Sequence, residues 1–289
     1  MNSKKNILVT GANGQLGMEF RALASASPTY NFLFTSRDEL SITNVDNVEE
    51  YFSANRISHC VNCAAYTTVD KAEVEKDIAF QHNGTAVGNL AAICKKHDAV
   101  FIHFSTDYVF NGQSSIPYTE EDETDPVNMY GASKLLGEQE TQKNNPSSVI
   151  IRTSWVYSSY GKNFVKTMLR LMSEKDTISV VNDQFGSPTY AYDLANAVMK
   201  IIDKYERPVP GIYNYSNSGV ISWFDFAKAI KEISGCNCAI LPVSTSQYPT
   251  PAKRPHYSVM DTAKIKETFG MVIPEWKESL RKCIELLKL

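Results

Sequence analysis

A glycine-rich turn near the N-terminus constrains the possible folds of this chain more than any other feature. The apolar, β-branched run at residues 6–10 indicates a buried parallel strand, and glycines follow it at positions 11, 14 and 17. Such glycines allow a tight turn, close backbone approach to a pyrophosphate and close helix packing. An ordinary strand-to-helix loop is the alternative. The turn predicts dinucleotide contacts from Gly11, Asn13, Gly14, Gln15, Leu16 and Gly17.

Strand and helix patterns alternate through the first half of the chain, which is typical of a parallel sheet covered on both faces. We therefore predict an α/β fold, a Rossmann-type doubly wound parallel sheet with a smaller C-terminal α/β substrate-binding lobe. The dinucleotide-binding domain is expected at residues 1–154 and the lobe at 155–289. The two are expected to interleave, with residues 176–182 and 211–234 returning to the first domain.

Composition excludes several classes of protein. The net charge is −3 over 289 residues with no basic stripe, so no nucleic-acid partner is expected. No apolar run approaches about 18 residues, and no signal peptide precedes the first strand, so a cytoplasmic protein without membrane contact is predicted. Among the six cysteines, Cys60, Cys63, Cys236 and Cys238 could form a zinc site, but reduced thiols are the favoured interpretation and no metal ligand is predicted.

Tyr130 and Lys134 form the strongest catalytic candidate pair. A spacing of four places both side chains on one face of a helix. An adjacent ammonium favours the phenolate, so Lys134 is expected to lower the pKa of Tyr130 toward the working range. The predicted strand at 100–105 delivers Thr106 and Asp107 to the carboxyl end of the sheet, where open α/β sheets bind ligands.

The end of the second predicted strand bears on the choice of cofactor. Folds that prefer NAD usually place an acid there, whereas an arginine accommodates the 2′-phosphate of NADP. This chain has Ser36 at the usual acid position with Arg37 beside it, which favours NADPH. Asp38 follows directly, so NADH stays open as the alternative.

Several longer segments resemble the dTDP-4-dehydrorhamnose reductase family, which belongs to the extended short-chain dehydrogenase/reductase superfamily. The resemblance covers nearly the whole chain. The segments that carry it are residues 62–67, 105–110, 152–157, 183–189 and 254–258, together with the glycine-rich turn and the Tyr130–Lys134 pair.

The resemblance implies NADPH-dependent reduction of the C4 ketone of dTDP-4-dehydro-L-rhamnose to dTDP-L-rhamnose, the last step of dTDP-rhamnose biosynthesis for cell-surface polysaccharide. Tyr130 would protonate the forming alkoxide, Lys134 would hold the nicotinamide ribose and Thr106 would hydrogen-bond the carbonyl oxygen. The cofactor would also contact Ala64, Ala65 and Tyr66.

Substrate contacts follow the same resemblance. Trp155 is expected to stack on the sugar and Arg254 to bind the diphosphate with its guanidinium fork. The other expected substrate contacts are Thr67, Thr106, Asp107, Gln184 and Thr189. Some family members resemble magnesium-bridged dimers held by glutamates. Glu19 matches one such position, but Tyr192 stands at another, which argues against Mg²⁺; a monomer or a homodimer is expected.

Three other functions compete with this interpretation. Related dehydratases carry a catalytic glutamate where this chain has Tyr108, which argues against water elimination. A nucleotide-sugar 4-epimerase uses the same tyrosine and lysine, and a reductase of another 4-keto-6-deoxyhexose would need a similar site. A non-catalytic subunit resembling the regulatory subunit of methionine adenosyltransferase is the third alternative.

Overall fold

The computed structural model describes residues 4–288 and is built around one six-stranded parallel sheet with strand order β10-β5-β4-β3-β1-β2. The order reverses between β1 and β3, as in doubly wound folds. This confirms the predicted fold class. The strands span β1 Lys5–Thr10, β2 Tyr30–Thr35, β3 Ile57–Asn62, β4 Val100–Thr106, β5 Val149–Thr153 and β10 Gly211–Tyr215.

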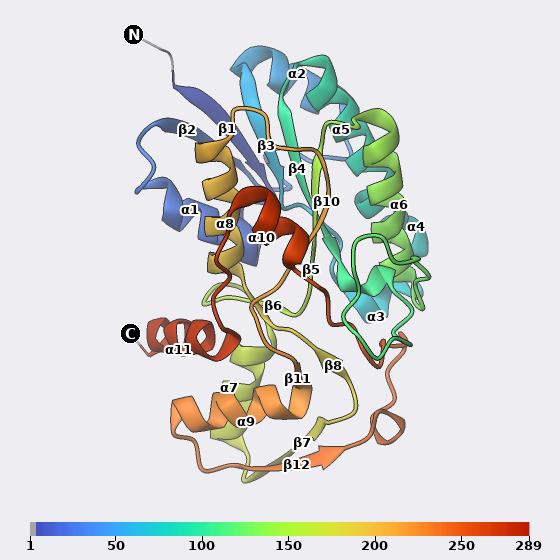
Figure 1. Cartoon of the computed structure of the whole chain (residues 1–289), viewed down its shortest axis with the longest axis vertical. Coiled ribbons are helices and arrows are strands. Elements are labelled where there is room, and N and C mark those ends of the chain that lie inside the picture. The colour runs from blue at the N-terminus through green and yellow to red at the C-terminus, as the bar shows by residue number, and fades with distance from the viewer. Residues whose placement is uncertain (1–3, 289) are drawn as a thin grey trace.

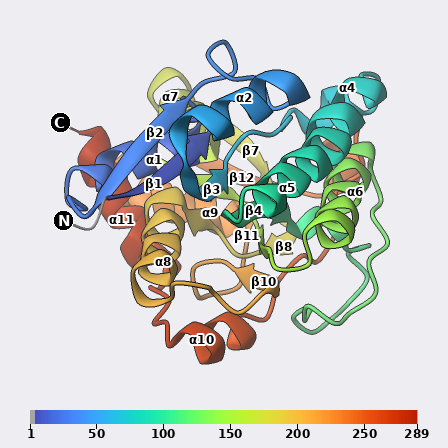
Figure 2. The ribbon, with the colours of Figure 1, turned by 90° about the horizontal axis from the view of Figure 1, so that it is seen from above.

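Helices cover both faces of this sheet (Figure 2). The first face carries α2 Val45–Asn55, α5 Ala86–Lys96 and α6 Met129–Asn144, and the second carries α1 Gln15–Ala24, α8 Ala191–Lys204 and α10 Ala263–Phe269. Both faces are apolar, so the central strands are buried throughout, as the sequence of β4 shows over all seven residues. Short elements bridge β3 to α5: α3 Val69–Ala72, α4 Lys76–Phe80 and a π-helical turn at Gln81–Thr85.

A smaller lobe lies beyond the carboxyl edge of the sheet (Figure 1). Its own hydrophobic cluster is formed largely by three helices, α7 Phe164–Glu174, α9 Trp223–Ser234 and α11 Trp276–Leu287. Three short strand pairs complete it: β6 Val156–Tyr157 with β9 Thr189–Tyr190, β7 Thr177–Val181 with β12 Ala239–Val243, and β8 Phe185–Gly186 with β11 Ile221–Ser222.

The prediction that residues 176–182 return to the main sheet is wrong. β7 pairs with β12 inside the lobe, and alternate residues of β7 are exposed, which suits a half-covered strand rather than a central one. Residues 211–234 divide between the two parts of the molecule. β10 pairs with β5 at the sheet edge, whereas α9 packs on α7 and α11 in the lobe.

A buried ion pair joins the sheet to α6. Arg152 on β5 donates from Nε and Nη2 to the two carboxylate oxygens of Glu138, at 2.9 and 2.8 Å. Both side chains are almost completely buried, at 3% and 2% exposure. Removing one member would leave the other charge desolvated without a partner.

We expect Glu138→Gln to lower the free energy of unfolding by about 3–5 kcal/mol, because the buried Arg152 guanidinium would then face a neutral amide in place of a carboxylate. The exposed helical pair Arg170–Glu174 is the matched control. There, Glu174→Gln should cost about 0.5 kcal/mol or less. Urea unfolding followed by circular dichroism measures both, and equal losses of stability in the two variants would contradict this account.

Candidate active site

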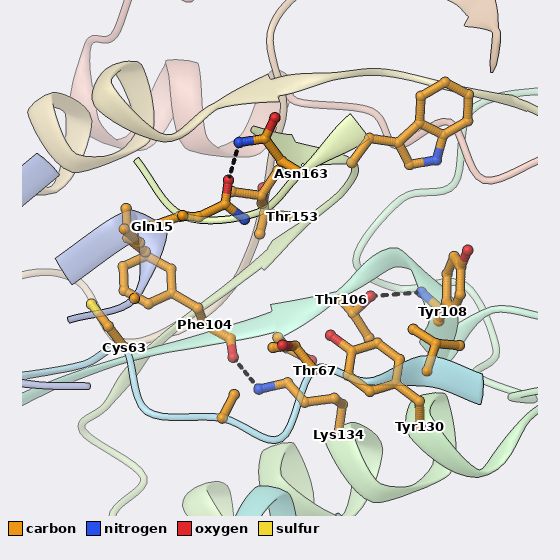
Figure 3. Close-up of a pocket in the computed structure, with 18 of the residues that line it drawn as sticks. Gln15, Cys63, Thr67, Phe104, Thr106, Tyr108, Tyr130, Lys134, Thr153 and Asn163 are labelled. Atoms are coloured by element: carbon orange, nitrogen blue, oxygen red, sulfur yellow. Dashed lines mark hydrogen bonds between the residues drawn. The ribbon is translucent and has the colours of Figure 1, made fainter. Parts of the chain in front are cut away.

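The largest cavity lies between the carboxyl edge of the sheet and the lobe, with a volume of about 570 Å³ (Figure 3). Parallel strands bring their carboxyl ends to one edge, so segments distant in sequence meet there. The glycine-rich turn, the ends of β3, β4 and β5, the start of α6 and a lobe segment all contribute. The predicted site residues in its wall are Asn13, Gly14, Gln15, Leu16, Ala64, Ala65, Thr67, Thr106, Asp107, Tyr130, Lys134 and Trp155.

A second cavity of about 330 Å³ shares part of this wall and extends toward the end of β2. It is lined by the remaining predicted cofactor residues other than Gly17, namely Gly11, Ser36, Arg37 and Tyr66. The two cavities together offer a continuous run of residues for a dinucleotide, with Ser36 and Arg37 at the end where an adenosine ribose would lie.

The glycine-rich turn fits a bound pyrophosphate. Gly11 has a φ of +62°, and a Cβ there would lie 2.6 Å from the backbone nitrogen of Ala64. Gly17 packs equally closely on the turn, since its Cβ would lie 2.5 Å from the Cα of Ala12. Gly17 therefore shapes the turn from behind. Gly14 precedes the first residue of α1, whose free N–H groups face the cavity end of the helix.

Helix α6 presents Tyr130 and Lys134 to the cavity. Asn128 is its N-cap and accepts a hydrogen bond from the Gly131 N–H at 2.8 Å. Glu73 accepts from the Met129 N–H at 2.9 Å. Sequence reasoning did not identify these two anchors, although an asparagine just before a helical pattern is a known start signal.

Lys134 is 3% exposed and points toward the end of β4 (Figure 3). Its Nζ donates to the carbonyl oxygen of Phe104 at 2.5 Å and lies 3.4 Å from Nε2 of His103. Burial lowers the pKa of Lys134 to about 8, although the charge of Glu138 acts in the other direction. The side chain therefore changes its charge close to neutral pH.

Tyr130 differs from the sequence-based expectation in its acidity. Burial and the charge of Asp107 raise its pKa to about 12, while the Thr106 hydroxyl lowers it in part. Lys134 does not contribute to this shift, so the expectation that it lowers the Tyr130 pKa is not met. A phenol that keeps its proton suits a proton donor.

Asp107 is a buried acid directly beside the candidate catalytic groups. The hydroxyl of Thr106 donates to its Oδ1 at 2.9 Å and accepts from the Tyr108 N–H at 3.2 Å. Its Oδ2 is buried without a hydrogen-bond partner in the part of the chain that the structure describes. Burial raises the pKa of Asp107 from 3.8 to about 7.

Trp155 lines the cavity, but not in the way the sequence suggested. Its ring stacks on Trp223 with centroids 3.6 Å apart and planes at 11°. A Cβ at Gly186 would lie 2.6 Å from the ring-fusion carbon Cε2, so Gly186 covers the indole from the other side. Neither face is free for the predicted stacking on a sugar ring, and the indole presents an edge to the cavity.

Three predicted substrate residues lie outside the cavity wall. Thr189 is fully buried behind Thr153, whose hydroxyl donates to it at 3.2 Å. Gln184 is 8% exposed and donates to the hydroxyl of Thr245 at 3.0 Å. Arg254 forms a two-pronged contact with Asp70, at 2.5 and 3.0 Å. Burial and pairing explain why residue type alone misplaced them.

The lobe adds cavity residues that sequence reasoning missed. Gly161, Lys162 and Asn163 line the wall opposite the glycine-rich turn. Asn163 donates to Oε1 of Gln15 at 2.9 Å, which ties the lobe to α1 (Figure 3). Long-range contacts of this kind leave no local sequence signal.

Glu19, the expected metal-bridging position, points into the protein. It is 2% exposed and accepts a hydrogen bond from Ser158 at 2.6 Å. Burial raises its pKa. Tyr192 lies near the start of α8 and packs on Tyr190. Residues 4–288 contain no cluster of three or more His, Cys, Asp or Glu side chains suited to a metal ion.

Comparison with known proteins identifies the family. The sequence model of the family described as the RmlD substrate binding domain matches residues 5–289. The chain belongs to this family. The resemblance predicted from the sequence is thereby confirmed.

Relatives of this RmlD family member are similar over nearly their full lengths. The spore coat polysaccharide biosynthesis protein SpsK of Bacillus subtilis (strain 168) is 44% identical, with 96% of both chains covered. A crystal structure of a dTDP-4-dehydrorhamnose reductase from Clostridium acetobutylicum ATCC 824 has a TM-score of 0.94 and 41% identity, covering 98% of this chain and 100% of that one. The reductase from Bacillus anthracis str. Ames, solved in complex with NADP, has a TM-score of 0.94 and 38% identity, with the same coverage.

The helices of this RmlD family member were also compared with the demands of a lipid bilayer. Across residues 4–288, none combines the length and apolar composition needed to cross one.

We expect Asp107→Asn to change how stability depends on pH. The asparagine keeps an oxygen that accepts from Thr106. The folded-state pKa of Asp107, about 7, lies above its ordinary value of 3.8, so charging this buried acid opposes folding as the pH rises through that interval.

The variant should therefore gain stability relative to the unsubstituted protein as the pH rises from about 4 to about 7. Urea unfolding at a series of pH values measures this difference. A difference that stays constant over the interval would show that Asp107 is already charged in the folded protein.

Proposed function

We propose that this protein reduces the C4 ketone of dTDP-4-dehydro-L-rhamnose to dTDP-L-rhamnose with NADPH. The observation that carries the proposal is the position of Tyr130, Lys134 and Thr106 on one wall of a cavity whose opposite wall is the glycine-rich turn. The relatives named above as reductases of this sugar, one of them bound to NADP, support the same reaction.

The chain's own residues account for the proton side of the reaction. Bound NADPH supplies a hydride to the carbonyl carbon. Tyr130, protonated at neutral pH, donates its proton to the oxygen as negative charge develops there. The Thr106 hydroxyl is placed to hydrogen-bond the same oxygen, and such donors are most effective in a buried site. Lys134 holds the ribose beside the nicotinamide.

The two cavities also divide the remaining binding roles. The glycine-rich turn with Ala64, Ala65 and Tyr66 is proposed for the cofactor. Thr67, Asp107 and the edge of Trp155 are proposed for the sugar. Arg254 reaches a diphosphate only by exchanging its contact with Asp70, so we place it at the rim of the substrate site.

Cellular context and assembly belong to the same proposal. We place the reaction in the cytoplasm, supported by the six cysteines, none of which forms a disulfide within residues 4–288. The acidic net charge gives no support for a nucleic-acid partner, and the protein is proposed to act as a monomer or homodimer.

The test of the function is NADPH oxidation, followed at about 340 nm, with dTDP-4-dehydro-L-rhamnose generated in situ. Sugar-dependent oxidation is the expected result. A 4-epimerase would interconvert sugars without net oxidation, and a regulatory subunit would bind cofactor without turnover. Oxidation with other 4-keto-6-deoxyhexoses at equal efficiency would assign a broader reductase.

We expect Tyr130→Phe to lower kcat by about 10²–10⁴-fold, because the variant has no proton donor at this position, while affinity for NADPH changes little. Tyr192→Phe removes a hydroxyl outside the cavity and is the control. Single-turnover kinetics and NADPH binding by fluorescence titration separate the two effects. Near-normal turnover in Tyr130→Phe would remove the proposed acid.

Arg37 is expected to determine the preference for NADPH. It is exposed at the end of β2 in the second cavity, where a 2′-phosphate would lie. Arg37→Ala should reduce kcat/KM for NADPH by about tenfold, as for the removal of one charge-assisted hydrogen bond, and leave NADH nearly unchanged. Arg56→Ala, on a left-handed residue after α2, controls for the general change in charge. Equal reductions with both cofactors would contradict the assignment.

A further inference from the structure

A chain of buried polar groups runs beneath the cavity from the loop after β3 to Lys134. The backbone N–H of Ala64 donates to Oδ1 of Asn62 at 3.2 Å. Nδ2 of Asn62 lies 3.1 Å from Nδ1 of His103, and Nε2 of His103 lies 3.4 Å from Nζ of Lys134. Asn62 and His103 are 1% and 0% exposed, so neither exchanges these partners for water.

The direction of every link in this chain is fixed by its first member. A backbone N–H only donates, so the Asn62 atom that faces Ala64 must be the oxygen. The Thr10 hydroxyl lies 2.6 Å from the same oxygen and donates to it. The Asn62 amide nitrogen therefore faces His103. Because an amide nitrogen only donates, Nδ1 of His103 must accept and carries no proton.

A neutral imidazole with an unprotonated Nδ1 has its proton on Nε2. His103 is neutral because burial, with a further contribution from the charge of Lys134, holds its pKa well below the ordinary value. Its Nε2–H consequently points at Nζ of Lys134. An ammonium has no lone pair to accept this hydrogen bond, whereas a neutral amine does.

The other groups that face Lys134 do little to favour its charge. The Phe104 carbonyl accepts from Nζ in either protonation state. Glu138, one turn along α6, has both carboxylate oxygens engaged by Arg152. Tyr130 on the same helix keeps its proton at neutral pH and contributes no charge.

We propose that Asn62 and His103 are positioning residues that hold Lys134 as a neutral amine in the protein without ligand, by directing the His103 Nε2–H at Nζ. Lys134 can then take up a proton on its lone pair beside Tyr130 and give it back, which a permanently charged lysine cannot do. This deepens the proposed function in its catalytic consequence, but the hydrogen-bond direction itself does not depend on it.

The direct test is the tautomer of His103, read by long-range ¹H–¹⁵N spectra of protein labelled on the histidine rings. His103→Gln assigns the signal, since the chain has five histidines. We expect the Nε2–H tautomer at neutral pH in the protein without ligand. An Nδ1–H tautomer or a doubly protonated ring would overturn the proposal. Because no substrate is present, this result is independent of whether the protein is a reductase.

Asn62→Asp reverses the chain without changing its shape. A carboxylate only accepts, so it still receives Ala64 and Thr10 but draws the His103 proton to Nδ1. Nε2 then accepts from Lys134, which favours the ammonium. We expect the tautomer to switch, and the alkaline limb of the pH profile for NADPH turnover to move up by about one pH unit.

Asn31→Asp on exposed β2 adds the same charge and is the control, with neither change expected. Retention of the Nε2–H tautomer in Asn62→Asp would contradict the proposed direction of the chain. If Asn62→Asp does not fold, the tautomer of the unsubstituted protein decides the question alone.

Discussion

The close approach of α6 to the backbone beside it fixes the geometry on which the rest of the site depends. A Cβ at Gly131 would lie 2.1 Å from the carbonyl oxygen of Tyr108, and one at Gly137 would lie 2.1 Å from that of Asn83. Gly131 directly follows Tyr130, and the two glycines lie on either side of Lys134 along the helix. No larger residue fits at either position, so α6 lies at one depth and presents both catalytic side chains at one height above the sheet.

Asn83 extends this constraint to the cofactor side of the cavity. Its Oδ1 accepts from the Tyr66 N–H at 2.8 Å, while its Nδ2 contacts the Tyr66 carbonyl at 2.9 Å and the Ser133 hydroxyl at 3.0 Å. It belongs to a π-helical turn, a distortion that is frequent at functional sites. The loop after β3 and the helix with Lys134 are therefore one hydrogen-bonded unit, so movement of bound cofactor against the catalytic groups is restricted.

The sequence was sufficient where a local pattern has a single physical solution. The glycine-rich turn and the four-residue spacing of Tyr130 and Lys134 predicted the sheet edge and the helix face correctly. It failed where distant contacts decide. Both faces of Trp155 are covered by Trp223 and Gly186, and Arg254 pairs with an acid far away in the sequence. Hydrogen-bond direction through buried groups is likewise a property of the folded arrangement.

The central claim is that hydride reaches the carbonyl carbon of the sugar while the protein supplies the proton to oxygen. The most direct measurement uses NADPH deuterated at C4 of the nicotinamide, with the product sugar examined by NMR. The account predicts one deuterium at C4 of a dTDP-6-deoxyhexose with equal amounts of NADP⁺ formed. Sugar products without deuterium and without net cofactor oxidation would contradict it and indicate epimerisation with retained cofactor.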